Sequence, residues 1–341
     1  MRLHRSVALF PLVLGLPLTG NAESTDDLAT RQNLITRKEW RSLSAEEKRS
    51  YLNAVQCLLD APPVTSTDIL PGVQNHFEDF LGTHILQAND MHYVAEIRAC
   101  GFEGGQPYWD WTLDGNSTDD FLNSEIFDPE TGFGGNGEFV PGTVENPSPD
   151  IPTTMEGVPL DVSDRSGGGC IPNGPFANMT IHMGPGESTS FYEWCVRRDF
   201  VPSIFLEATS QEALEAAMSH PDFGFFSQGT EISNHAAGHL GVGGLYGTLT
   251  DVWASPGDPL FFLHHANMDR LWWSWQSRNL SERLTDISGP VVPQDWTNES
   301  GRNVTLDDLV HVGTTENITM SIRDLMDIQS PGLGYSYDSL Y

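Results

Sequence analysis

The chain has 341 residues, of which 38% are hydrophobic and 10% aromatic, which is enough to bury one large core. Its formal net charge of −30 at pH 7 opposes binding to phosphate backbones and to anionic lipid, so we expect neither nucleic acid nor a membrane among its partners. Length and composition together favour a single main domain over residues 23–341.

The first 22 residues have the pattern of a signal peptide. Arg2 and Arg5 precede a short apolar stretch, and small residues follow at Gly20 and Ala22. Six Asn-x-Ser/Thr glycosylation acceptors fit a chain that passes through the secretory route: Asn116, Asn178, Asn279, Asn298, Asn303 and Asn317. We therefore expect a secreted protein, located outside the cell or in a vacuole.

The four cysteines are an even count in an oxidising compartment, which favours two disulfides over thiol chemistry or zinc. Three connectivities are possible. Sequence order suggests that Cys57 pairs with Cys100 and Cys170 with Cys195.

Helical patterns dominate the secondary structure that we expect. Residues 37–60 carry helix formers and a periodic apolar set, and residues 211–218 and 259–279 also favour helices. Residues 112–175 are rich in Gly, Pro, Asp, Asn and Ser and show no period, which predicts a long surface excursion. Short strands are expected at 180–182 and beyond residue 303. The chain is therefore predicted to be mainly α, with long loops and a few short strands.

The strongest chemical signal lies between His235 and His265. His235 and His239 are four residues apart, which places both imidazoles on one face of a helix, at a separation that can hold one metal ion. Downstream, the run Ser-Pro-Gly-Asp-Pro-Leu-Phe-Phe-Leu-His-His begins at residue 255, and His264 or His265 could supply a third ligand. Three neutral imidazoles suit copper and leave positions open for dioxygen.

Asp269 lies one helical turn beyond His265. It could accept a hydrogen bond from a metal-bound imidazole and so fix its tautomer. Alternatively, it could form a helix salt bridge with a nearby arginine.

The two histidine segments together resemble the tyrosinase family, close to its short fungal members. The match covers roughly residues 37–279, and it includes Gln-Pro-Tyr-Trp-Asp-Trp at 106–111 and His-His-Ala-Asn-x-Asp-Arg-x-Trp-Trp at 264–273. The resemblance implies an antiparallel four-helix bundle around two copper ions. It assigns His235, His239 and His265 to the second copper, with His264 as a neighbour of the ligands.

For the first copper, the same resemblance implies His84 and His92 as ligands. Eight residues correspond to about 80° around a helix, so a break between the two is needed to aim both at one ion. The family's third ligand follows in a run resembling Phe-Leu-x-Trp-His-Arg, and this sequence has no such run: the position nine beyond His92 is Gly101.

Three explanations compete for the missing ligand. The first is an error in the gene model or in splicing, the second is a pseudoenzyme that has lost the ligand, and the third is recruitment of His76, His182 or Glu96. We favour the first, because the second histidine cluster and the cysteine count are preserved.

The resemblance implies oxidation of phenols or catechols to o-quinones with O2. In the family, the residues after the first two ligands of the second site influence phenol hydroxylation; here they are Ala236 and Leu240, which favours catechol oxidation. Val252 and Trp253 are candidates for the mouth of the substrate cavity. The alternatives are a degenerate copper-binding pseudoenzyme and, less favoured, an oxygen carrier resembling haemocyanin.

Overall fold

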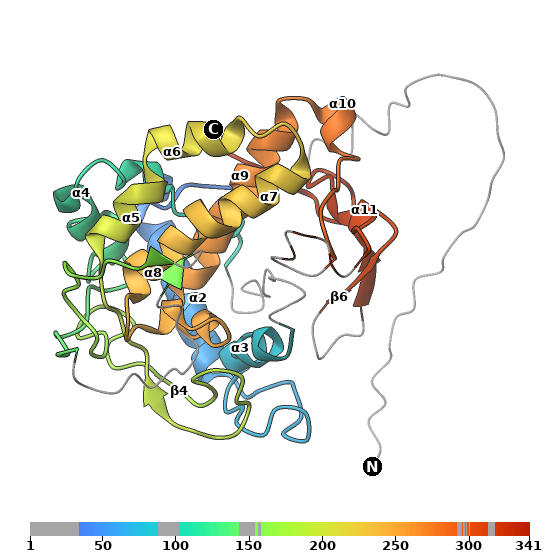
Figure 1. Cartoon of the computed structure of the whole chain (residues 1–341). Helices are drawn as coiled ribbons and strands as arrows, with labels where there is room; N and C mark the ends of the chain where they lie inside the picture. Colours follow the sequence, from blue (N-terminus) through green and yellow to red (C-terminus); the bar gives the residue numbers. More distant parts are fainter. Residues whose placement is uncertain are drawn as a thin grey trace, which may run out of the picture.

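The computed structural model describes residues 34–87, 102–142, 154–155, 158–291, 295, 297, 299, 301–312 and 318–341. The expected signal peptide, His92, Glu96 and Cys100 lie outside these ranges. Within them, the chain is mainly helical with a few short strands, as predicted (Figure 1).

The α-helices, in chain order, are α2 (Ala45–Asp60), α3 (His76–Gln87), α4 (Thr118–Leu122), α5 (Pro202–Thr209), α6 (Gln211–Met218), α7 (Phe223–Thr230), α8 (Ala236–Gly243), α9 (Leu260–Ser277), α10 (Leu280–Arg283) and α11 (Ile322–Leu325). Single turns of 3-10 helix are η2 (Trp40–Ser42), η4 (Trp111–Leu113), η5 (Glu125–Phe127), η7 (Thr248–Thr250) and η8 (Ser255–Gly257), and η6 (Glu231–His235) is a π-helical turn.

The described strands pair two by two. β1 (Ile35–Arg37) lies parallel to β8 (Tyr335–Tyr337), with Ile35 opposite Tyr335. The other pairs are antiparallel: β2 (Thr154–Met155) with β3 (Val158–Pro159), β4 (Thr180–Ile181) with β5 (Trp194–Cys195), and β6 (Leu309–Val312) with β7 (Ile318–Ser321). The strands expected near 180 and beyond 303 are thereby confirmed.

Helix α3 carries one site histidine on its buried face. Phe77, Leu81, His84 and Ile85 follow the spacing of one side of a helix, and all four are buried. This face packs toward α2, whose own start is fixed by a capping box in which Ser44 and Glu47 exchange hydrogen bonds. The packing directs the imidazole of His84 into the protein interior.

Asp258 lies between the 3-10 turn η8 and the start of helix α9. The Asp258 carboxylate accepts the Leu260 N–H at 3.0 Å and forms a fully buried two-bond ion pair with Arg198, at 2.8 Å for each bond. Both charges are satisfied by each other, so this buried pair fixes the start of α9 and, with it, the direction of its histidines.

Residues 112–175 differ from the surface excursion that we predicted. Phe121, Ile126, Phe133 and Ile171 in this segment are all fully buried and belong to the main core. The segment reaches the core through short turns and a five-residue helix, which leave no helical or strand period in the sequence.

The predicted helix over residues 37–60 is also corrected at its start. Only α2, from Ala45, is helical over more than one turn, because Arg37 belongs to β1 and pairs with β8 from the far end of the chain. The C-terminal residue, Tyr341, lies against α9, and its hydroxyl is 3.0 Å from Asp110. The end of the chain, which lies outside the family resemblance over residues 37–279, therefore packs on α9.

The Cys170–Cys195 disulfide is present as predicted, with 5.6 Å between the two Cα atoms. Cys57 is also disulfide-bonded, and its predicted partner Cys100 lies outside the described residues. No helix in the described part of the chain has the length and apolar character that a bilayer crossing requires.

Candidate metal centre

His235 and His239 come from a continuous helical segment that contains a π turn. α7 runs into η6, which ends at His235, and α8 then carries His239. A π turn inserts an extra residue into a helix and is frequent at functional sites. Here it ends at the first histidine of the pair, and the two ring centroids lie 4.6 Å apart.

Four histidines meet between α8 and α9. One potential ligand atom from each of His235, His239, His264 and His265 lies within 4.8 Å of the others. The Nε2 atoms of His239 and His265 are 3.0 Å apart, close to the separation of about 3.3 Å between two nitrogens bound tetrahedrally to one ion. The prediction that these two helices converge on one metal site agrees with this geometry.

The ring orientation of His239 suits a metal ligand. Its Nδ1 lies 2.6 Å from the Leu249 carbonyl oxygen, so Nδ1 carries the proton and donates it. Nε2 is then the unprotonated nitrogen, on the side of His265. Burial lowers the pKa of His239 well below its ordinary value, and the neighbouring His235 acts in the same direction. A neutral imidazole with a fixed tautomer is the form that binds copper.

His84 has the same arrangement on α3. Its Nδ1 lies 2.7 Å from the Trp253 carbonyl oxygen, so Nδ1 carries the proton and Nε2 is the unprotonated nitrogen. Burial lowers the pKa of this imidazole as well. The ring of Phe261 on α9 lies 5.3 Å from that of His84 and 5.9 Å from that of His239. His84 therefore faces the group on α8 and α9 with one aromatic ring between them.

His264 lies inside the group rather than behind it. Its side chain is fully buried, and its ring centroid is 4.7 Å from that of His239 and 5.0 Å from that of His265. On α8, the absence of a side chain at Gly238 makes room for it, since a Cβ there would lie 2.1 Å from Cε1 of His264. The ring of Trp111 is 5.2 Å away.

Asp269 makes its hydrogen bonds to the terminal strands. Its carboxylate accepts from Arg37 at 3.1 Å, from Tyr335 at 2.8 Å and from Tyr337. Of the two roles that we considered, the structure supports an ion pair. The partner is an arginine 232 residues away in sequence, not a neighbour on the same helix.

The residues proposed for the substrate cavity lie in two places. Leu240 is 4% exposed and packs with Val201 and Ile204, and Ala236 packs against the same apolar cluster. Val252 is 51% exposed, and the backbone of its neighbour Trp253 contacts His84. Val252 and Trp253 thus combine access to solvent with contact to a site histidine, whereas the side chain of Leu240 is buried.

Two of the three substitute ligands that we considered, His76 and His182, lie in the described residues and contact carboxylates. Nδ1 of His76 lies 2.7 Å from Asp79, and Nδ1 of His182 lies 2.7 Å from the buried Glu78. Neither belongs to the histidine group found in the described residues. His84 is likewise outside that group, so recruitment of His76 or His182 to the first copper stays a hypothesis.

Sequence reasoning missed the groups that orient the imidazoles. Two are backbone carbonyls, at Leu249 and Trp253, which no residue pattern reveals. A third is Glu231, whose carboxylate lies 3.2 Å from Nδ1 of His235. Glu231 precedes His235 by four residues, a helical spacing that could have indicated it.

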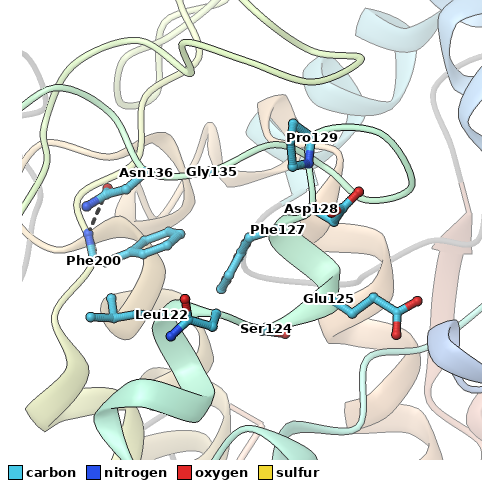
Figure 2. Close-up of a pocket in the computed structure, with 10 residues that line it drawn as sticks. Leu122, Ser124, Glu125, Phe127, Asp128, Pro129, Gly135, Asn136 and Phe200 are labelled. Carbon is cyan, nitrogen blue, oxygen red and sulfur yellow. Dashed lines mark hydrogen bonds between the residues drawn. The ribbon is translucent and has the colours of Figure 1, made fainter.

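A cavity of about 490 Å³ is lined by residues between 122 and 136 and by Phe200 (Figure 2). Phe127 and Phe200 form its apolar wall, and Asn136 at its rim already accepts the Phe200 N–H at 3.1 Å. None of its lining residues belongs to the histidine group.

This chain is similar in sequence and in structure to several known proteins. The common central domain of tyrosinase matches residues 74–278. Tyrosinase P from Aspergillus terreus is 31% identical over 339 residues, covering 88% of this chain and 90% of that protein. N-acetyl-6-hydroxytryptophan oxidase ivoB from Emericella nidulans is 30% identical over 358 residues, covering 90% of this chain and 93% of that protein.

Among solved structures, a point mutant of a polyphenol oxidase from Thermothelomyces thermophila superposes with a TM-score of 0.77 at 29% identity, covering 92% of both chains. The sequence similarity, the shared fold and the group of four histidines all indicate the same family. The chain belongs to the tyrosinase family, whose members are dicopper oxidoreductases.

Proposed function

We propose that this protein oxidises catechols to o-quinones with O2, using copper held by its histidines. His235, His239 and His265 would bind one copper, and His84 and His92 would contribute to the other. The observation that carries the proposal is the shared orientation of His239 and His84. Each donates its Nδ1 proton to a backbone carbonyl and keeps Nε2 for a metal, and the two rings flank Phe261.

When bound, the copper pair would supply the two-electron redox chemistry with O2. The protein residues hold the imidazoles neutral and oriented and shield the centre from water. Each catechol loses two electrons and two protons to become a quinone, and two catechols reduce one O2 to two waters.

Catechol oxidation is favoured over phenol hydroxylation by the residue after the first ligand of the second site. That residue is Ala236, which cannot hydrogen-bond a proton-accepting water as an asparagine could. The relative named for oxidation of N-acetyl-6-hydroxytryptophan supports an aromatic hydroxyl compound as substrate. Val252 and Trp253 would border the entrance to the centre.

Entry into the secretory pathway is part of the proposal. Of the six acceptor asparagines, Asn116, Asn178, Asn279 and Asn303 are described, and all four are exposed. A glycan at any of them would meet solvent.

The missing third ligand of the first copper supports a second candidate, a pseudoenzyme that binds one copper. No Trp-His-Arg run follows His92 in the sequence. Sequencing the transcript across residues 90–101 separates the candidates. Recovery of that run would give a two-copper oxidase, whereas a transcript that encodes this sequence, together with one copper per chain, would leave the pseudoenzyme.

Copper content and quinone formation test the oxidase proposal directly. We expect His239→Gln to lose the copper of the second site and all catechol oxidation. His220→Gln is the matched control, because that ring contacts Gly229 of α7 outside the histidine group, and it should keep both properties. A purified wild-type protein that holds copper but oxidises no catechol would refute the activity.

A further inference from the structure

One short segment orients a histidine of each copper site. We call residues Leu249–Trp253 the strap. At one end, the Leu249 carbonyl accepts the Nδ1 proton of His239, and at the other end the Trp253 carbonyl accepts that of His84. The two carbonyls that orient imidazoles from α8 and α3 thus belong to residues only four positions apart in sequence.

A buried carboxylate shapes the second end of the strap. Asp251 is 1% exposed and accepts three backbone N–H groups, from Gly186, Trp253 and Ala254, each at 2.9 Å. One carboxylate oxygen takes the Trp253 and Ala254 amides together, and the other takes Gly186 from a separate loop. Bonds from amides to an ionised carboxylate are stronger than neutral ones, so they hold the peptide that presents the Trp253 carbonyl.

The first end of the strap is held by different contacts. A Cβ at Gly243 would lie 2.0 Å from Oγ1 of Thr250, so the strap packs directly on the backbone of α8. Leu249 itself lies in η7 and is fully buried. The Leu249 end of the strap is therefore positioned by packing on α8, which carries His239, and not by the Asp251 carboxylate.

We propose that Asp251 is a positioning residue for His84. Its three amide bonds fix the turn whose carbonyl selects the tautomer of that imidazole, while His239 is oriented independently at the other end of the strap. The inference rests on the proposed copper function only for its effect on metal binding. The effect on the His84 tautomer needs no metal.

Removal of the Asp251 carboxylate should affect the orientation of His84 and not that of His239. In Asp251→Ala the turn loses its three acceptors, the Nδ1 proton of His84 loses its fixed partner, and copper binding at the first site should weaken by about 10- to 100-fold, as for other groups that orient metal-bound histidines. Asp251→Asn keeps an oxygen for Trp253 and Ala254 and should retain most of the wild-type behaviour.

Asp128→Ala is the matched control. Asp128 accepts the N–H groups two and three residues ahead, Glu130 at 2.8 Å and Thr131 at 2.7 Å, which is the same local arrangement as Asp251 with Trp253 and Ala254. It lines the cavity of Figure 2, none of whose lining residues belongs to the histidine group. Its loss should lower thermal stability and leave His84 unchanged.

The experiment has two readouts on wild type and the three variants. Long-range 1H–15N NMR of the metal-free protein reports the tautomers of His84 and His239, assigned with His84→Gln and His239→Gln, and chelator competition gives copper affinity and stoichiometry. We expect Asp251→Ala to lose the Nδ1-protonated form at His84 alone, with Asp251→Asn and Asp128→Ala close to wild type.

Two results would overturn the inference: an unchanged His84 in Asp251→Ala, or equal loss at His84 and His239 in both alanine variants, which would indicate general loosening. A wild-type protein that binds no copper would refute the proposed function. The NMR comparison would still decide the role of Asp251.

Discussion

At the scale of single residues, the four-histidine group depends on a position without a side chain. Gly238 lies on α8, between His235 and His239 in sequence. The ring of His264 occupies the space beside it. The ring is confined from several sides, since Trp111 and His239 also contact it. The glycine is therefore a packing requirement of the four-histidine group.

Gly238→Ala should displace the His264 ring, because its Cβ would lie 2.1 Å from Cε1. We expect a loss of about 1–3 kcal/mol in the free energy of unfolding, the usual range for overpacking, together with weaker copper binding. Urea unfolding of the metal-free protein measures the first effect. Gly135→Ala is the control, since its nearest neighbour would be at an ordinary 3.6 Å, and equal losses in both variants would contradict the argument.

At the scale of elements, the two terminal strands are joined to α9 by the hydroxyl groups of two tyrosines and by one arginine. The Arg37 guanidinium lies 3.6 Å from the ring centre of Tyr335, and both groups bond Asp269. The hydroxyl of Tyr337 lies 2.8 Å from the Ala266 carbonyl. Burial raises the pKa of Tyr335 and of Tyr337 well above the ordinary value, and the Asp269 charge adds to the effect.

These shifts predict a loss of stability at alkaline pH. Free tyrosine ionises near pH 10, so below that pH both states keep the phenol proton and the contribution to stability is complete. As pH rises above about 10, only the unfolded chain releases the proton, and stability falls.

Tyr337→Phe removes one such group and should reduce the steepness of the fall in unfolding free energy above pH 10 by up to about 1.4 kcal/mol per pH unit. Denaturant unfolding between pH 8 and 11, values chosen to bracket the onset at about 10, measures this slope. Tyr192→Phe, at an exposed ring, is the control. The interpretation fails if Tyr337→Phe keeps the wild-type slope.

At the scale of the whole molecule, the proposed metal centre would join helices from distant parts of the chain. His84 comes from α3, His239 from α8 and His265 from α9. The same three elements are positioned by the Arg198–Asp258 pair, the strap and the packing against α2. A metal bound by these side chains stabilises the native state and not the unfolded one.

Copper should therefore raise the unfolding free energy by about 2.7 kcal/mol per occupied site at a free concentration 100 times the dissociation constant. Thermal unfolding during copper titration, and after removal of the metal by a chelator, measures this gain. His84→Gln should lose the part that comes from the first site, and His220→Gln should lose nothing. If His84→Gln gains as much as wild type, only the second site binds copper.

The sequence by itself determined the helices at 211–218 and 259–279 and the spacing of the histidines on them, because these depend on neighbours within a few residues. The four-residue spacing of His235 and His239, the turn before α9 and the boundaries of α6 all follow local rules. The mainly helical fold and the pairing of Cys170 with Cys195 were also predicted correctly.

Only the tertiary structure decided which groups orient the imidazoles. The carbonyl that accepts the His84 proton lies 169 residues away, and the arginine paired with Asp269 lies 232 residues away. The buried side chains of residues 112–175 likewise come from short turns without a period. Contacts between distant residues leave no periodic pattern in the sequence. Backbone carbonyls are chemically the same at every position, so the residue type does not reveal which carbonyl accepts a hydrogen bond.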